Sequence, residues 1–394
     1  MINHGRVTLG HMEAVTFGRS VVEALPEEIE NCGAERFFLI FSETLDRTTN
    51  EVQKLRTTLG SKLVGQFSSI GAHTPREGVI AATKEVRDTS ADILVTFGGG
   101  SITDGAKAVT LCLANDIFKP EDIDLLLPQK DSDGCLLPPD FSGPQLNQIC
   151  IPTTLSAAEF TAVAGVTDQR TSTKEMLRHP DIMPHAVILD PIAAQFTPEW
   201  LFLSTGIRAI DHCVEGICSN EAHAFGDAFA VKGLSLLARG LPHLKSDPTD
   251  LAARLDCQIG AWMSAGPLVS GVPMGASHGI GYVLGARFGI PHGHTSCIML
   301  PAVMRWNKIA NSERQTLVAD TLGVIDESVS NDAGDRLDAL ISGLGMPRNL
   351  NSVGINREYF QEIAEQAMST HWVPRNPRTI AGPAEIVEIL ELAA

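Results

Sequence analysis

The sequence lacks long uninterrupted apolar runs, paired cysteines and any excess of basic residues. Asp, His or Arg interrupts its most apolar stretches before they reach the length of a membrane-spanning helix. The opening residues, MINHGRVTLGHMEAVTFG, lack the apolar core of a secretory signal. A net charge of −17 argues against nucleic acid or an anionic membrane as a partner.

Eight cysteines are spread singly along the chain, and none forms a CxxC pair. This pattern is typical of reduced thiols that pack as small apolar side chains. We therefore expect a cytoplasmic protein that acts on a small molecule, without nucleic acid or membrane as a partner, and we expect it to be a homodimer.

The first half of the chain alternates short apolar runs with amphipathic patterns. A chain of 394 residues is too long for one small core, so two domains are expected. Strands alternating with helices predict a parallel sheet covered by helices on both faces. The expected strands are residues 37–41, 93–97 and 148–152, and the expected helices are residues 52–63, 76–88 and 104–115.

The second half shows long helical patterns and no persistent strand-like alternation. We expect an α/β domain over residues 1–185 and an all-helical domain over residues 186–394. An acidic, proline-rich stretch at residues 120–141 is expected to be a surface loop. The expected helices of the second domain are residues 201–219, 225–239, 250–264, 313–322, 336–344, 359–368 and 384–393.

A glycine-rich loop follows the strand at 93–97. Gly98, Gly99, Gly100 and Ser101 lie between that strand and a helix beginning near Asp104. Consecutive glycines allow a ligand to approach the backbone closely, and a helix N-terminus favours a pyrophosphate. The alternative is a tight strand–helix turn with no ligand, since the GxGxxG pattern is absent.

Two acidic residues accompany this loop. Asp104 either caps the following helix or hydrogen-bonds a nicotinamide amide. Glu43 follows the strand at 37–41, where an acid can accept hydrogen bonds from adenosine ribose hydroxyls. A surface glutamate is equally common at such a position.

Histidines gather in three segments of the second half. His212 lies in GIRAIDHCVEG, His278 in GASHGIGYVLG, and His292 and His294 in IPHGHTS. Imidazole is the most common metal ligand, so these segments indicate a shared site for a divalent ion. The alternative is that each histidine is an ordinary core or surface residue.

These residues resemble those of the iron-containing alcohol dehydrogenase family. GGGSITDGAKA is similar to the family's GGGSxxDxAKA, and PTTLSAAEFTAVAGVTD is similar to its PTT segment, with Ala158 where the family has Ser. His278 and His292 are fourteen residues apart, as in the H-x13-H metal pair of the family, and the sequence IPHG ends this segment. The resemblance runs nearly end to end.

The resemblance implies the dehydroquinate synthase-like fold of this family, with an α/β dinucleotide-binding domain and an all-α domain. It implies NAD(H) or NADP(H) as cofactor. The cofactor contacts would come from Glu43, the loop Gly98, Gly99, Gly100 and Ser101, and from Asp104, Thr153, Thr154 and Lys174.

Two departures from the family pattern affect the expected metal site. The family motif GMDALTHAIE holds two metal ligands, Asp and His, but here Arg208 replaces the Asp while His212 remains. A guanidinium cannot ligate a cation. Asp211 points about 100° around the helix from His212, so it could substitute only if the backbone shifted. Tyr282 replaces the second His of the family's HxxxH, and a phenol can still relay a proton.

Maleylacetate reductases resemble this chain in lacking the Asp ligand, where they carry Asn, and in the HCVE segment. The resemblance implies activity without an added metal on dicarboxylate substrates. Arg208 would bind a substrate carboxylate in bidentate fashion. The alternative is that Arg208 pairs with Asp211 or Glu159 and only fills space.

The main hypothesis is therefore a maleylacetate reductase-like enzyme that reduces a keto group with NAD(P)H. Its catalytic residues would be Tyr282, Arg208, His278 and His292, without an essential metal, and Glu43 would favour NAD(H) by repelling a 2′-phosphate. The second hypothesis is an alcohol or aldehyde dehydrogenase that holds Fe²⁺ or Zn²⁺ on His212, His278 and His292. Dehydroquinate synthase-like lyase chemistry and a non-catalytic nucleotide-binding relative are further alternatives.

Overall fold

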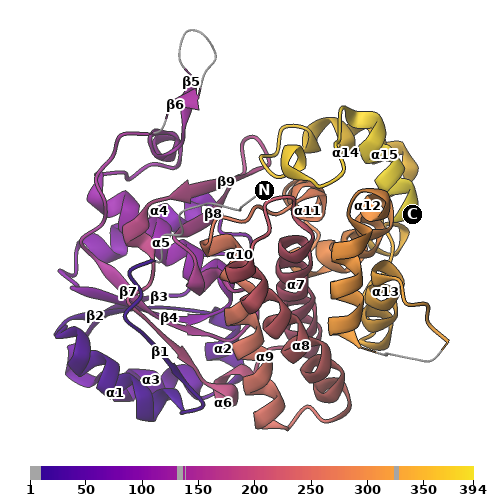
Figure 1. Ribbon diagram of the computed structural model, residues 1–394. Helices are drawn as coiled ribbons and strands as arrows, with labels where there is room; N and C mark the ends of the chain where they lie inside the picture. Colours follow the sequence, from indigo (N-terminus) through magenta and orange to yellow (C-terminus); the bar gives the residue numbers. More distant parts are fainter. Residues whose placement is uncertain (1–9, 131–135, 138, 324–327) are drawn as a thin grey trace. The chain divides into compact units, whose positions relative to one another are not determined.

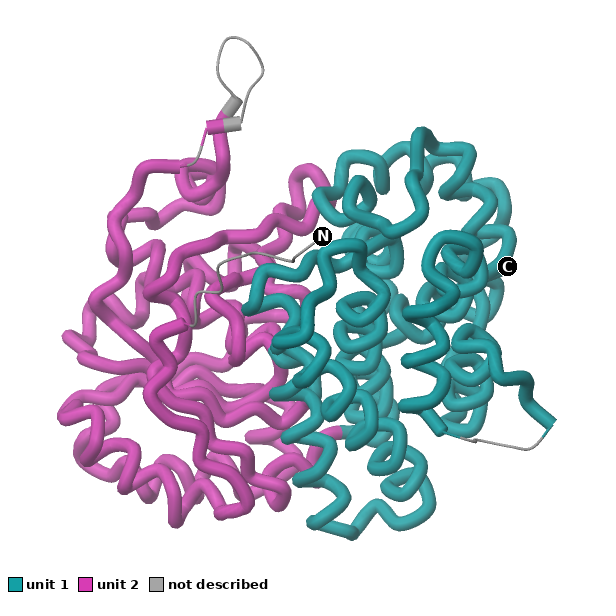
Figure 2. Tube along the Cα trace, in the orientation of Figure 1, with its two compact units in different colours: residues 1–9, 155–157, 198–394 teal, residues 10–154, 158–197 magenta. Residues whose placement is uncertain are grey.

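The computed structural model describes residues 10–130, 136–137, 139–323 and 328–394 (Figure 1). The described chain divides into two compact units (Figure 2). Unit 2 contains residues 10–154 and 158–197, and unit 1 contains residues 155–157 and 198–394. The boundary lies after residue 197 instead of the expected 185, because residues 186–189 form a strand of the unit 2 sheet.

Unit 2 is built on a six-stranded sheet in the order β1-β10-β7-β4-β2-β3, and every neighbouring pair is parallel. The residues of β2 and β4 are all buried, which explains their continuous apolar sequences FFLIF and ILVTF. The strands are β1 (Ala14–Phe17), β2 (Phe37–Phe41), β3 (Leu63–Phe67), β4 (Ile93–Gly98), β7 (Asn147–Pro152) and β10 (Ala186–Leu189).

Helices cover both faces of this sheet. Phe37, Leu39 and Phe41 of β2 pack in one core with α1 (Val21–Cys32) and α3 (Glu51–Leu59). Phe38 and Ile40 pack in a second core with α4 (Arg76–Arg87) and α5 (Gly100–Ala114). Alternate side chains of a strand point to opposite faces, so one strand contributes to both cores. The prediction of a helix-covered parallel sheet is confirmed.

Shorter elements complete unit 2. The expected loop at residues 120–141 was only partly correct: it includes a 3₁₀ helix and a small β5–β6 hairpin, while residues 131–135 and 138 lie outside the described residues. These elements are α2 (Glu43–Thr48), η1 (Gly60–Lys62), η2 (Pro120–Leu126), β5 (Gln129–Lys130), β6 (Leu136–Leu137), η3 (Ala158–Phe160), η4 (Pro180–Ile182), α6 (Pro191–Ala194), and the antiparallel pair β8 (Val163–Asp168) and β9 (Thr173–Arg178).

Unit 1 is helical, and its described residues contain no strand, as the sequence predicted. Every residue of α7 from Phe202 to Cys218 is buried, including four charged or imidazole side chains. The helices are α7 (Glu199–Cys218), α8 (Ala224–Ser246), α9 (Leu251–Ser264), α10 (Gly266–Val269), α11 (Ala276–Phe288), α12 (His292–Leu322), α13 (Ala333–Gly343), η5 (Asn351–Val353), η6 (Arg357–Tyr359), α14 (Phe360–Ala367), η7 (Val373–Arg375) and α15 (Pro383–Leu392).

Helix α11 and the first half of α12 were missed in the sequence because glycine and proline interrupt their helical patterns. In α11, glycine allows close packing: a Cβ on Gly281 would lie 2.9 Å from Thr295 Oγ1. Pro301 lies inside α12, and Asn311 has a non-helical backbone where the helix is kinked. Across the described residues, no helix is both long and apolar enough to cross a membrane.

Candidate active site

The glycine loop of unit 2 joins β4 to α5. Gly98 ends β4, Gly99 is the N-cap of α5, and Gly100 and Ser101 begin the helix. A Cβ on Gly99 would lie 3.0 Å from Thr154 Cγ2, so a larger residue would displace this neighbour. Gly99, Gly100 and Ser101 are half-buried, and the helix dipole favours a negatively charged group at this end of α5.

The loop lies where the order of the sheet strands reverses. Strands β2 and β4 are neighbours in the sheet. The next strand after β2 in the chain, β3, lies beyond β2 on one side, while β7 and β10 follow beyond β4 on the other side. Ligands of open α/β sheets bind beside the carboxyl ends of strands at such a point. Glu43 is the exposed first residue of α2, one residue after Ser42, whose N–H donates to Phe97 O of β4 over 3.0 Å.

Thr153 and Thr154 follow β7 beside the glycine loop. The N–H of Thr153 donates to Gly98 O over 3.0 Å, which ties the two strand ends together. The Thr154 hydroxyl is buried and has no hydrogen-bond partner among the described residues. A buried hydroxyl without a partner carries a desolvation cost that a bound ligand could offset.

Asp104 lies inside α5 and is not its cap, because Gly99 holds the N-cap position. Its Oδ2 accepts a hydrogen bond of 3.1 Å from Gly165 N of β8. Lys174 of β9 donates from Nζ to Gly165 O over 3.4 Å, so both side chains flank the same glycine. Burial raises the pKa of the Asp104 carboxyl, and the nearby Lys107 and Lys174 oppose this shift.

Two further buried charges of this region were not predicted. Lys107 donates from Nζ to the carbonyls of Ala158, Thr161 and Val163, and so fixes the backbone that precedes β8. Glu159 is buried, and in the described part of the chain its Oε2 has no hydrogen-bond partner. Burial raises the pKa of Glu159 to about 7.

In unit 1, candidate residues from three helices lie close together. Arg208 and His212 are one turn apart on α7, and His278 and Tyr282 are one turn apart on α11, so each pair shares a helix face. The rings of His212 and His278 have centroids 4.9 Å apart. Tyr282 stacks on His292 of α12 at 5.7 Å, and the Arg208 guanidinium carbon lies 5.9 Å from the Tyr282 ring centroid.

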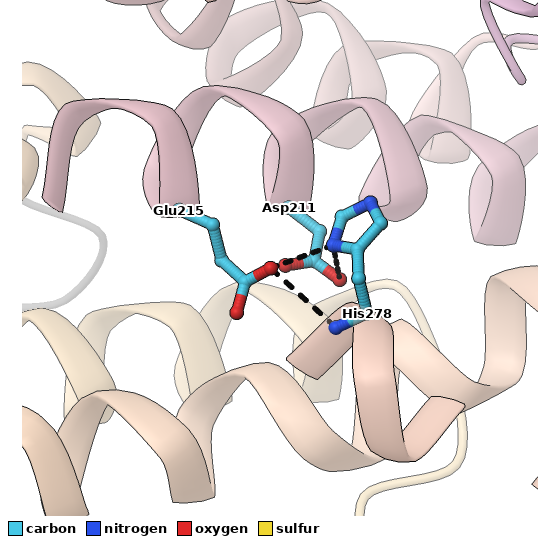
Figure 3. Close-up of side chains that lie close together, drawn as sticks. All are labelled: Asp211, Glu215 and His278. Carbon is cyan, nitrogen blue, oxygen red and sulfur yellow. Dashed lines mark hydrogen bonds and ion pairs between the residues drawn. The ribbon is translucent and has the colours of Figure 1, made fainter. Parts of the chain in front are cut away.

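Glu215 holds His278 in place (Figure 3). Its Oε2 lies 2.7 Å from His278 Nδ1 and accepts from Gly275 N over 2.9 Å, while Oε1 accepts from Ser277 N over 2.8 Å. The carboxylate thus caps the N-terminus of α11 as well as orienting the imidazole. Glu215 was missed as a site residue, although it is the last residue of the HCVE segment.

Arg208 and Asp211 form a buried ion pair, which is one of the two pairings expected from the sequence if Arg208 is structural. Arg208 Nη1 lies 3.5 Å from Asp211 Oδ2 and donates to Ser296 Oγ over 3.0 Å. Asp211 Oδ2 also accepts from Ser277 Oγ and Ser296 Oγ, over 2.8 and 2.6 Å. Burial lowers the pKa of Arg208 and raises that of Asp211. Arg208 Nε is buried without a partner among the described residues.

The donor atoms of this cluster fit a divalent cation poorly. Asp211, Glu215 and His278 offer ligand atoms within 4.8 Å of one another, but those atoms already hydrogen-bond within the protein. His212, His278 and His292 do not form such a group in the described residues. His212 Nδ1 and His278 Nε2 have no partner there, and burial lowers both imidazole pKa values, that of His278 to about 3. Arg208 places a positive charge beside them.

Tyr282 has a defined hydrogen-bond partner. The indole N–H of Trp372 donates to its hydroxyl oxygen over 3.2 Å, so the phenol proton is available to a different acceptor. His294, the fourth predicted histidine, instead packs against Trp200 with ring centroids 5.4 Å apart. The cluster therefore combines a phenol donor, neutral imidazoles and a guanidinium, which together can stabilise a developing alkoxide and supply a proton.

Comparisons with known proteins identify the family of this chain. Residues 13–191 match the iron-containing alcohol dehydrogenase model, and residues 202–394 match the C-terminal model of that family. The chain is 34% identical to Dehydrogenase FUM7 of Gibberella moniliformis, across 96% of both chains. It is 28% identical to a maleylacetate reductase of Sphingobium indicum, across 96% of this chain and 94% of the relative. The crystal structure of maleylacetate reductase from Agrobacterium tumefaciens superposes with a TM-score of 0.80 at 25% identity, covering 100% and 98% of the two chains. The chain therefore belongs to the iron-containing alcohol dehydrogenase family of NAD(P)-linked oxidoreductases.

Proposed function

We propose that this enzyme uses NAD(P)H to reduce the keto group of a small, carboxylate-bearing substrate, without an essential metal. The observation that carries the proposal is the buried guanidinium of Arg208 within the cluster of His212, His278 and Tyr282. A cation at this position favours an anionic substrate over a metal ion. Relatives named maleylacetate reductases support the same substrate class.

Arg208 would orient the substrate through its carboxylate. Nη1 is already engaged by Ser296 and Asp211, so the guanidinium is held in one orientation. Its Nε–H lacks a protein acceptor in the described residues, which leaves donor capacity for a ligand. A fixed donor costs less ordering free energy on binding than a mobile one.

Tyr282 would supply the proton. When bound, reduced nicotinamide would supply the hydride to the carbonyl carbon, and the carbonyl oxygen would then need one proton. The hydroxyl oxygen of Tyr282 accepts a hydrogen bond from the Trp372 N–H, so the Tyr282 hydroxyl proton remains free to be donated. His292, stacked on the Tyr282 ring, is the neighbouring polar group that would help to hold the alkoxide.

The hydrogen bond between His278 and Glu215 supports a role for His278 as an acceptor. With its Nδ1 proton directed at Glu215, neutral His278 presents an unprotonated Nε2 and accepts hydrogen bonds at that atom. We propose that it accepts a hydrogen bond from a substrate hydroxyl or a water molecule.

For the cofactor, we propose binding across Gly98, Gly99, Gly100 and Ser101, with Asp104, Thr153, Thr154 and Lys174 beside this loop. Glu43 follows β2 at the same edge of the sheet and supports a preference for NAD(H), because a carboxylate repels a 2′-phosphate. A higher kcat/KM with NADPH than with NADH would reverse this assignment.

A metal-dependent alcohol or aldehyde dehydrogenase is the second candidate. It is favoured by the unpartnered His212 Nδ1 and His278 Nε2, and by Glu215, since a carboxylate partner is typical of metal-binding histidines. Such a site would hold Fe²⁺ or Zn²⁺ through His212, His278 and His292.

Steady-state kinetics on keto acids and neutral aldehydes of matched size test the proposal. Arg208→Ala and Arg208→Lys should raise KM for keto acids at least tenfold, because Lys lacks the bidentate fork, and should leave aldehydes nearly unaffected. Thermal unfolding of each variant must be measured, since Arg208→Ala leaves the Asp211 charge buried without its partner. Equal losses on both substrate classes would show that Arg208 only supports the fold.

A further inference from the structure

The turn between Gly71 and Pro75 in unit 2 contains two adjacent residues in the left-handed backbone region. His73 has φ +60° and Thr74 has φ +55°. Few non-glycine residues adopt positive φ, and a β-branched residue such as threonine is a clear outlier. Strained residues of this kind persist only where surrounding contacts fix them, and they cluster at ligand sites.

The contacts that fix this turn come from β8 and from the glycine loop. Thr167 of β8 donates from its N–H to Thr74 O over 2.9 Å and from its hydroxyl to His73 O over 2.7 Å. The Thr74 hydroxyl donates to Ser101 O over 3.3 Å. Both strained residues are therefore held next to the loop that is proposed to bind the cofactor.

The side chain of His73 is half-buried, and the hydrogen bonds above use its backbone only. Burial and the positive charge of Lys174 lower the pKa of the imidazole, so it is neutral at pH 7 and carries one N–H donor. Lys174 makes the local potential positive, and Asp104 is the acidic group beside Lys174. A neutral donor near an ammonium is suited to an anionic oxygen.

We propose that His73 is a ligand-binding residue that donates a hydrogen bond to an anionic oxygen of a molecule held at the glycine loop. That oxygen belongs to the pyrophosphate of the cofactor. The strained turn aims the imidazole and keeps it from relaxing away. This inference rests on the proposed function, because it assumes a nucleotide at the loop.

The test uses His73→Ala in the full-length enzyme, with His185→Ala as the control. His185 is another half-buried histidine of unit 2, and it lies just before β10 instead of in the strained turn. The dissociation constants of NADH and ADP-ribose are measured by fluorescence, and KM for the keto acid by steady-state kinetics. Loss of a hydrogen bond to a charged group should weaken binding by about tenfold or more.

Weaker binding of both NADH and ADP-ribose by His73→Ala than by His185→Ala would support the contact with the pyrophosphate. Nucleotide affinities of His73→Ala that match those of wild type and His185→Ala would overturn the inference, whatever the KM for the keto acid. Failure of the wild-type enzyme to bind NADH or NADPH would instead overturn the proposed function, so the two failures are distinguishable.

Discussion

Trp372 donates its indole N–H to the hydroxyl oxygen of Tyr282 over 3.2 Å, which orients the phenol and leaves its proton free. If that proton is delivered to the alkoxide, Tyr282→Phe should lower kcat by about 10²–10⁴-fold with little change in nucleotide affinity. Tyr359→Phe is the matched control, since Tyr359 is the chain's other tyrosine and packs against Phe288. A Tyr282→Phe enzyme with near wild-type kcat would make the phenol a packing residue only.

Chelation tests the metal prediction. We expect activity to survive prolonged dialysis against a chelator, because Arg208 provides positive charge where a carboxylate ligand would be needed. Loss of activity on chelation, with recovery on addition of Fe²⁺ or Zn²⁺, would establish the metal-dependent alternative.

Replacing Arg208 with an acidic residue should strengthen metal binding. Arg208→Asp removes the cation and adds a carboxylate one helical turn before His212, so we expect tighter Zn²⁺ binding by calorimetry. Arg208→Asn is the matched control, since it removes the same charge without adding an anionic ligand. Equal Zn²⁺ affinities of the two variants would contradict the expectation.

Gly99→Val should abolish nucleotide binding. The new side chain would begin 3.0 Å from Thr154 Cγ2 and extend into the space beside the first turn of α5. Gly343→Val is the control, because a Cβ there meets no atom within 4 Å. Circular dichroism would verify that both variants fold, and retention of wild-type NADH affinity by Gly99→Val would remove the glycine loop from the cofactor site.

Glu159 should make stability depend on pH. The pKa of Glu159 in the folded protein is about 7, which lies above the ordinary glutamate value. The contribution of Glu159 to the free energy of unfolding is therefore fully present below pH ~4.5, and it is lost as the pH rises through 7, because the folded state disfavours the ionised carboxylate. Glu159→Gln should therefore be more stable than wild type at pH 8, by an amount of the order of 3 kcal/mol, with little difference at pH 4.5. Urea unfolding at both pH values measures this, and a constant difference would contradict it.

The sequence predicted the elements whose apolar pattern is regular. The strands at 37–41, 93–97 and 148–152 were expected within one residue of β2, β4 and β7, because central parallel strands carry continuous apolar runs. The edge strands β1 and β3 were missed, since they are only partly buried. Helix α11 was missed because its glycines serve packing against other segments, which a local pattern does not reveal.

The sequence indicated which residues belong to the candidate site, but it did not indicate which of their side chains contact one another. Motif resemblance identified Arg208, His212, His278, Tyr282 and His292. Which side chains pair depends on tertiary structure: Glu215 reaches His278 from α7, although 63 residues separate them in sequence. The strain at His73 and Thr74 has no local signature, because neither residue type requires positive φ.

The edge strand β1 also has a consequence for synthesis of the chain. In the described sheet its neighbour is β10, with Ala14 opposite Ala186. At ordinary elongation rates roughly ten to thirty seconds separate the synthesis of these two strands. Strands β2, β3 and β4 can pair with one another during that interval, while the emerging N-terminal strand waits for β10. The sheet can therefore be completed only after β10 has been synthesised, and a chain stopped before residue 186 leaves β7 as an unpaired, aggregation-prone edge.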